Sequence, residues 1–261
     1  MKSQGTNLKI WESVTVYGYS IFVGSITPGR LGEFIKAIYF HKKGTTISAS
    51  FYGTLLDRLF DLLVISLIGS TVFFTLAGVF KEINSTIILI YLISISIMSL
   101  AILKSSILTI IIEKSAKLFG RKKFMDKISS NNFDTKDFII QLNTKSIILS
   151  FIITTLALIC NFSSIYYLSK SIGLGIPYFD MLGISALVSL VSMIPITFLG
   201  IGTRDLVLIQ LLSLYGVDEV TSIALSTLIL FLLISNALIC SFSLLTNIGN
   251  LRWKDTSKDL I

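Results

Sequence analysis

The sequence predicts an all-α fold: a polytopic helical membrane protein with two re-entrant or broken-helix segments arranged as a pseudo-repeat. Three observations predict it. First, 53% of the 261 residues are hydrophobic and only 14% are charged, whereas soluble domains average about 25% charged residues. Second, several runs without a charged residue approach the roughly 20 residues that a helix needs to cross a bilayer. Third, two apolar stretches are interrupted by proline and glycine in similar ways. The uncharged runs are residues 62–80, 83–103, 146–169, 181–203 and 220–251.

The first element is the uncharged stretch 13–29, which is followed by the short apolar run 34–40. Neither half is long enough to span a bilayer comfortably. Proline lacks a backbone donor and glycine relaxes a helix, so we expect a break at Pro28, Gly29 and Gly32. Non-helical backbone survives at membrane depth only inside protein or beside a wet cavity. We therefore expect a re-entrant hairpin that enters from the cytoplasm and returns to it.

Residues 46–80 contain no proline and predict one long helix, and residues 83–103 predict a span in the opposite direction. The connector that follows, residues 104–145, holds nine basic and four acidic residues, +5 of the total net charge of +7. Basic connectors of membrane proteins lie on the cytoplasmic side and are attracted to anionic lipids. We expect this connector and the C-terminus to be cytoplasmic and the protein to be a multi-pass protein of the cell membrane.

The second half of the chain is predicted from the same signals. A span is followed by a Gly/Pro turn, a broken helix and a last span, and the break is expected at Pro195, Gly200 and Gly202. One transmembrane domain, residues 1–261, accounts for the whole chain. The expected elements are a span at 146–169, a turn at 173–177, helices at 178–194 and 206–215, and a span at 220–247.

Charged residues accompany both breaks, and the long helix carries a third group. Paired broken segments in corresponding halves indicate the binding site of a repeat-built transporter, and helix N-termini left open at a break favour anions such as phosphate. Placing an arginine within the bilayer costs at least roughly 2.5–3.5 kcal/mol of insertion free energy. This cost indicates that each arginine either has a function or is paired with a counter-charge. The candidate substrate-binding residues are Arg30, Glu33, Lys36, Asp57, Arg58, Asp61, Arg204 and Asp205, four basic against four acidic.

Structural explanations for these residues stay open at this point. Proline and glycine are common in transmembrane helices, glycine also lets helices approach closely, and a neutral set of charges can form an ion-pair network without a ligand. The functional interpretation is a polar, partly hydrated cavity in which the arginines hold a lipid phosphate and the carboxylates orient them or bind an amine or sugar.

Three motifs in order resemble one family. They are Pro28-Gly29-Arg30-Leu31-Gly32-Glu33 with Lys36, then Asp57-Arg58-Leu59-Phe60-Asp61, and then Gly200-Ile201-Gly202-Thr203-Arg204-Asp205. Together they resemble the flippase-like transmembrane domain of the lysylphosphatidylglycerol synthase family, over nearly the whole chain. The resemblance implies movement of a lipid between leaflets. Family members usually carry further helices before the first motif, and the synthases add an aminoacyl-transferase domain. We therefore expect a stand-alone member that lacks both, without synthase activity.

Three functions remain open. The first is a lipid flippase or transporter that moves an anionic or lipid-linked headgroup, with membrane phospholipid or polyprenyl-linked lipid as its partner and no cofactor. The second is a membrane-embedded enzyme that uses Glu33, Asp57 or Asp61 as acid or base. The third is a non-catalytic scaffold for cell-envelope glycosyltransferases. The single histidine, His41, and the two cysteines in apolar runs predict no metal site, and nucleic acid is not an expected partner because no soluble domain is available to hold it.

Overall fold

The computed structural model describes residues 10–43, 45, 47–79, 144–193 and 200–241. Within these residues the chain is helical and contains no strand, so the all-α prediction is confirmed for the part of the protein that is described. The predicted span 83–103 and Pro195 lie outside the described residues. Of the predicted connector 104–145, only the last two residues are described, and they belong to the helix that follows.

The first half consists of α1 (Ile10–Ile26), the 3-10 helix η2 (Pro28–Phe34), α2 (Ile35–Lys42) and α3 (Ile47–Val79). The interruption between α1 and α2 coincides with the predicted break. The helix predicted at residues 46–80 is found as α3, which is long because no proline interrupts its sequence.

The second half consists of α8 (Thr144–Ser171), α9 (Tyr178–Ser192), α10 (Thr203–Ser213) and α11 (Glu219–Ser241). Two segments in this half, Ile147–Ser171 and Glu219–Ser241, are long and apolar enough to cross a membrane. Each predicted element of the second half is therefore present, with ends that differ from the prediction by a few residues where they are described.

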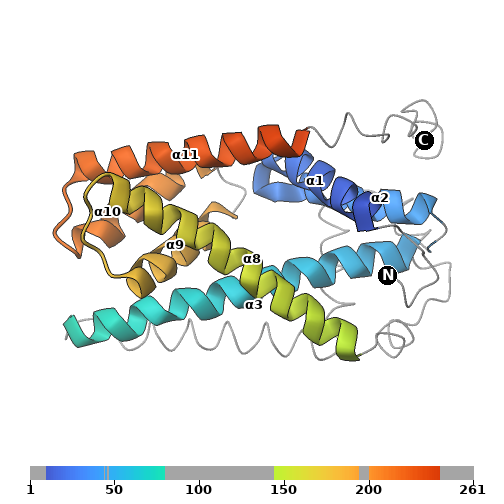
Figure 1. Ribbon diagram of the computed structural model, residues 1–261, viewed down its shortest axis with the longest axis horizontal. Helices are drawn as coiled ribbons and strands as arrows, with labels where there is room; N and C mark the ends of the chain where they lie inside the picture. Colours follow the sequence, from blue (N-terminus) through green and yellow to red (C-terminus); the bar gives the residue numbers. More distant parts are fainter. Residues whose placement is uncertain (1–9, 44, 46, 80–143, 194–199, 242–261) are drawn as a thin grey trace.

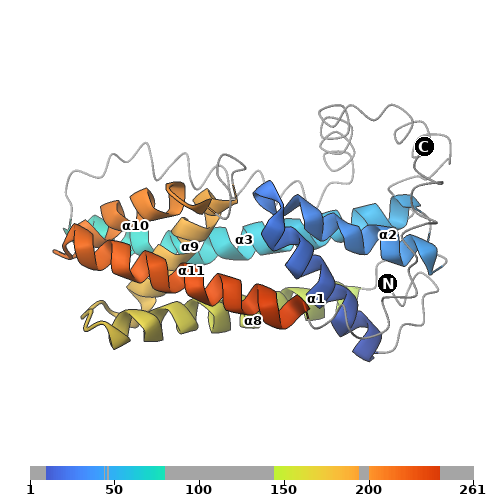
Figure 2. The same ribbon diagram turned by 90° about the horizontal axis from the view of Figure 1, so that it is seen from above.

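The elements form an elongated helical bundle (Figure 1). The long helix α3 extends along most of its length, α8 crosses it at an angle, and α11 lies on the other side of the bundle (Figures 1 and 2). The short helices α9 and α10 lie at one end of the bundle, whereas α1 and α2 lie toward the other (Figures 1 and 2). Helix α9 packs against α3 and α8, and α1 packs against α11, which joins the two halves of the chain.

The apolar core lies where α3 of the first half meets α8, α9, α10 and α11 of the second half. Met181, Ile184, Leu208 and Leu225 have no exposed surface there. At Gly183 a Cβ atom would collide with the Val72 side chain, so glycine permits the close approach of α9 to α3. This core holds α3 together with the helices of the second half.

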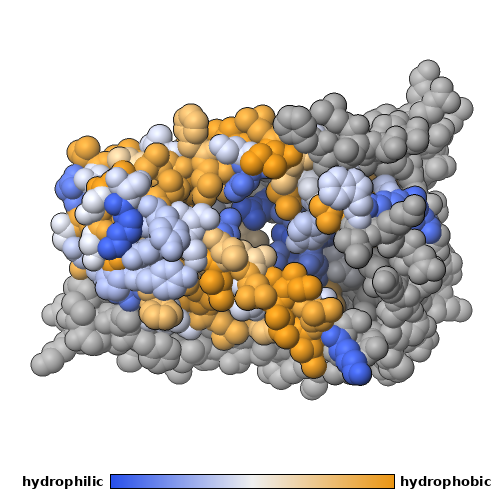
Figure 3. Space-filling model, in the orientation of Figure 1, coloured by the Kyte–Doolittle hydropathy of each residue, from blue (hydrophilic) through white to orange (hydrophobic). Residues whose placement is uncertain are grey.

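The outer surface of α8 and α11 is apolar. Both helices expose large aliphatic or aromatic side chains along their length, and hydrophobic residues cover much of these helices in Figure 3. Apolar surface of this extent is unfavourable in water but is stable against lipid tails. The exposed aliphatic residues of α8 include Ile148, Leu149, Ile152, Ile153 and Leu156.

Candidate functional site: a charged cluster beside an interrupted helix

The interruption after α1 is a tight hairpin that the Thr27 side chain closes. Thr27 has an extended backbone (φ −105°, ψ 140°), which ends α1. Its Oγ1 accepts a hydrogen bond from the Gly32 backbone N–H at 2.7 Å. A Cβ atom at Gly32 would lie 2.5 Å from the Val23 carbonyl oxygen, so only glycine lets η2 pack this closely against α1. Sequence reasoning placed the break correctly but gave no role to Thr27.

Arg30 lies in the turn of this hairpin with a positive φ of 56°. It is the only residue other than glycine with a positive φ in the described part of the chain. Left-handed backbone costs such a residue roughly 1–2 kcal/mol, and residues held this way cluster at functional sites. The Arg30 side chain is exposed, and none of the described residues forms an ion pair with it.

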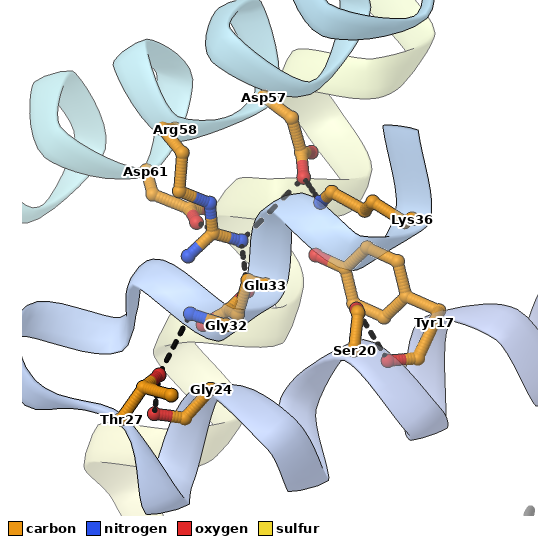
Figure 4. A network of polar contacts seen from close by, with 10 residues as sticks. All are labelled: Tyr17, Ser20, Gly24, Thr27, Gly32, Glu33, Lys36, Asp57, Arg58 and Asp61. Carbon is orange, nitrogen blue, oxygen red and sulfur yellow. Dashed lines mark hydrogen bonds and ion pairs between the residues drawn. The ribbon is translucent and has the colours of Figure 1, made fainter. Parts of the chain in front are cut away.

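Arg58 connects the interrupted segment to the long helix. Its Nη2 lies 2.6 Å from Oε2 of Glu33, which follows the hairpin, and 3.0 Å from Oδ2 of Asp61, one turn further along α3. A third carboxylate, that of Asp57, lies 3.5 Å away. Figure 4 shows these side chains pointing toward one another across the space between η2 and α3. The Arg58 guanidinium therefore contacts three carboxylates.

Lys36 completes the cluster from α2. Its ammonium forms an ion pair with Asp57 and lies 4.7 Å from the centre of the Tyr17 ring of α1, a cation–π contact. Only 4% of Lys36 is exposed. Lysine is almost never buried unless it is paired, so these two contacts explain its position. Tyr17 (Figure 4) was not among the predicted site residues, because a single tyrosine in an apolar stretch carries no sequence signal.

The cluster carries a surplus of negative charge. Glu33, Asp57 and Asp61 contribute three negative charges and Lys36 and Arg58 two positive ones, a formal net charge of −1. Glu33 is only 3% exposed, and charges in such surroundings interact more strongly than in water. The cluster is thus stable only while each carboxylate keeps a cationic or hydrogen-bonding partner.

A hollow with hydrophilic residues at its edge opens in the middle of the face drawn in Figure 3. In the same view of the ribbon, the hollow lies between α3 and the junction of α1 and η2 (Figure 1). The charged side chains of the cluster come from η2, α2 and α3. The hollow is bordered by the apolar helices α8 and α11 (Figures 1 and 3). The face drawn in Figure 3 therefore combines hydrophilic residues at the hollow with apolar surface around it.

The second interruption precedes α10. Gly200 and Gly202 have positive φ values of 72° and 89°, which favour glycine. Asp205 caps the helix, because its Oδ2 accepts a hydrogen bond from the Gly202 N–H at 2.9 Å. Its Oδ1 accepts from Arg204 Nη2 at 3.1 Å and also contacts the Ser226 hydroxyl of α11.

Arg204 is buried, with 3% of its surface exposed. Its Nε donates to the Ser226 hydroxyl at 3.0 Å as well as to Asp205. These contacts fasten the start of α10 to α11. Ser226, like Tyr17, is a site residue that the sequence gave no reason to choose.

The predicted site residues therefore fall into three groups. Glu33, Lys36, Asp57, Arg58 and Asp61 form one contact network. Arg204 and Asp205 pair with each other, and among the described residues no ion pair joins them to that network. Arg30 stands apart on the surface. In both ribbon views the start of α10 lies toward the junction of α1 and η2 (Figures 1 and 2), so the two interruptions lie in the same part of the molecule.

The comparison with protein families decides what these motifs represent. A family described as "Lysylphosphatidylglycerol synthase TM region" matches residues 1–248. The chain belongs to this family. As a lysylphosphatidylglycerol synthase TM-region protein it is a helical membrane protein, and the family match includes every residue of the charged cluster and of both interruptions. Comparison with curated proteins and with solved structures gave no match.

Proposed function

We propose that this protein is a lipid flippase or transporter that moves a phospholipid or polyprenyl-linked headgroup between the leaflets of the cell membrane. The observation that carries the proposal is the charged cluster at the first interruption, which adjoins a hydrophilic hollow bordered by apolar helices. The family assignment supports a membrane protein in a lipid-related process.

The physical argument concerns the barrier to headgroup movement. Transfer of an unpaired charged or strongly polar group into hydrocarbon costs several kcal/mol or more. Hydrogen bonds and ion pairs along a polar recess replace part of the lost hydration, while the acyl chains stay in lipid. The exposed guanidinium of Arg30 is available to a phosphate, and a carboxylate of the cluster is available to an amine or a hydroxyl group.

Arg204 has a different part in this proposal from the one that the sequence suggested. Its guanidinium is engaged by Asp205 and Ser226, so it supports the second interruption, and contact with a phosphate would require it to leave these partners. Its Nη1 has no hydrogen-bond partner among the described residues. After such a rearrangement this nitrogen could donate to a phosphate oxygen. We therefore propose Arg30 as the first phosphate contact.

The test is lipid transfer in vesicles that contain the purified full-length chain. Fluorescent phosphatidylglycerol placed in one leaflet reports transfer through its loss to a membrane-impermeant quencher. The wild-type protein should increase the transfer rate above that of protein-free vesicles. In the variant Arg30→Ala, the protein-dependent part of the transfer rate should be about 10–100-fold smaller than in the wild type. The reason is that a hydrogen bond to a charged group contributes roughly 1.5–3 kcal/mol.

The matched control is Lys170→Ala, which removes one positive charge from an exposed residue at the far end of α8. Its transfer rate should equal that of the wild type. Equal transfer in Arg30→Ala and in the wild type would reject the role of Arg30. Chemical conversion of the lipid by protein in detergent, where no leaflets exist, would favour a membrane-embedded enzyme instead.

The orientation is part of the same proposal. We place the connector 104–145 and the C-terminus in the cytoplasm, where the connector is also the surface on which a glycosyltransferase would dock. Labelling of single cysteines introduced into the connector of intact cells tests this, because a membrane-impermeant reagent should not reach them.

A further inference from the structure

Gly24 occupies a buried position in the last turns of α1. Glycine destabilises the interior of a helix relative to alanine, and here the backbone gives no reason for it, because Gly24 is not among the residues with a positive φ. A residue that weakens its own helix without a conformational need calls for another physical cause.

The cause lies in the space that a side chain at this position would take. A Cβ atom on Gly24 would lie closer to the Glu33 Cγ than the 3.0 Å below which real Cβ contacts essentially never occur, and 3.3 Å from both Cδ and Oε1. The collision is with the middle of the Glu33 side chain, so it could not be avoided by turning the carboxylate alone. Glu33 is 3% exposed, so neighbouring atoms enclose it on its other sides as well.

Glu33 in turn is held at both ends. Its backbone follows Gly32, which the Thr27 side chain fastens to α1. Its carboxylate lies 2.6 Å from Arg58 Nη2. The side chain therefore extends from the hairpin to α3 along the surface of α1 at Gly24, and Figure 4 shows Gly24 and Glu33 near the same part of the hairpin.

We propose that Gly24 is a positioning residue for Glu33: the missing side chain provides the space through which Glu33 reaches Arg58. Alanine at this position displaces Glu33, separates its carboxylate from the guanidinium and leaves the cluster without the contact that joins the interrupted segment to α3. The placement of Glu33 follows from geometry alone, whereas its consequence for lipid transfer rests on the function proposed above.

A double-mutant cycle separates this role from ordinary helix packing. In the wild-type background, Gly24→Ala should lower the melting temperature of the detergent-solubilised protein by about 2 °C or more, because overpacking strains the site. In a Glu33→Ala background, which removes the colliding atoms, the same substitution should raise it by about 2 °C, because alanine is the better helix former. Gly175→Ala, where a Cβ would have no atom within 4 Å, is the control and should behave alike in both backgrounds.

Infrared spectroscopy provides a readout that a purely structural role would not change. The difference between the spectra of the wild type and Glu33→Gln identifies the carboxylate band of Glu33. This band should shift in Gly24→Ala, because the carboxylate no longer contacts the Arg58 guanidinium. If Gly24→Ala does not accumulate in membranes, accumulation of the double variant with Glu33→Ala supports the proposal and failure of both overturns it.

Two results overturn the proposal directly: a change of the same sign for Gly24→Ala in both backgrounds, or an unshifted Glu33 band. The proposed function is tested separately. If the cycle shows the reversal of sign but Gly24→Ala transfers lipid at the wild-type rate, the positioning role of Gly24 stands and the use of this cluster in lipid transfer is rejected.

Discussion

Replacement of Arg58 by methionine is the most direct test of the charged cluster. Arg58 Nη2 lies within 3.5 Å of three carboxylates, those of Glu33, Asp57 and Asp61. The substitution keeps much of the apolar volume of the side chain and removes its charge, so that the net charge of the cluster changes from −1 to −2. Lys36 then remains as its only cation among the described residues.

The magnitude follows from burial. Removal of one partner of a buried ion pair costs about 3–5 kcal/mol because the other charge stays buried without compensation. The Arg58 side chain is 14% exposed and that of Asp57 is 30% exposed, so water still reaches part of the cluster. We therefore expect the lower end, about 3 kcal/mol, which corresponds to a fall of roughly 6–12 °C in melting temperature for a chain of this size.

The measurement is thermal unfolding of the purified protein in detergent, followed by fluorescence. A second substitution, Asp61→Asn, should restore at least half of the loss in the Arg58→Met background, because it removes one uncompensated carboxylate. Lys170→Met removes an exposed charge and should change stability by less than about 0.5 kcal/mol. An Arg58→Met protein as stable as the wild type, or no recovery by Asp61→Asn, would refute the reasoning.

Three further predictions concern other parts of the chain. Asp218 accepts hydrogen bonds from the backbone and side chain of Thr221, which hold its pKa below the usual value; the stability that this carboxylate contributes is present above the ordinary aspartate pKa of about 3.9 and is lost as pH falls through the lowered value. Melting temperatures of the wild type and Asp218→Ala should thus differ at neutral pH and converge in acid. Asp205→Ala should destabilise the protein by about 3 kcal/mol, since Arg204 would keep a buried charge without a counter-charge. Arg30→Gly should keep or raise stability by up to about 1 kcal/mol, because relief of left-handed strain (roughly 1–2 kcal/mol) exceeds the entropy cost of glycine, while lipid transfer falls.

Each of these three predictions has its own contradicting result. A difference between the wild type and Asp218→Ala that persists in acid would mean that the carboxylate does not act through its charge. A stable Asp205→Ala protein would mean that Arg204 finds another partner. A marked loss of stability in Arg30→Gly would show that the arginine has a packing role, and Arg30→Asn, which tolerates the same backbone, serves as its control.

The sequence was sufficient for those elements whose cause is local. The helix expected at residues 46–80 is observed at Ile47–Val79, and the span expected at 146–169 is observed at Thr144–Ser171. Long apolar runs without proline are a sufficient signal for such helices in the sequence. The interruption at Pro28 follows equally from the local chemistry of proline and glycine.

The partners within the site could not be derived in this way. Three contacts depend on how distant segments pack. They are the ion pair of Glu33 with Arg58, the ion pair of Lys36 with Asp57, and the hydrogen bond from Arg204 to the Ser226 hydroxyl. Spacing along the chain indicated that Asp57 and Asp61 share a face of the helix, but it contained no information about which cation lies opposite that face.

Charge counting shows what the structure adds for function. The sequence suggested four cations and four carboxylates in one neutral set. In the structure one pair, Arg204 with Asp205, neutralises itself, and the cluster around Arg58 keeps a charge of −1. The remaining cation is Arg30, which is exposed and held in a strained conformation three residues before Glu33.

A phosphate that binds Arg30 would bring its negative charge toward a negative cluster, so an anionic headgroup without a cation should bind weakly. In a headgroup with both a phosphate and a cationic or hydroxyl-rich part, the phosphate would bind Arg30 and the other part would bind the carboxylates of the cluster. Transfer rates for such lipids above those for phosphatidic acid, whose headgroup is a phosphate alone, would support this division of the charges, and the reverse order would contradict it.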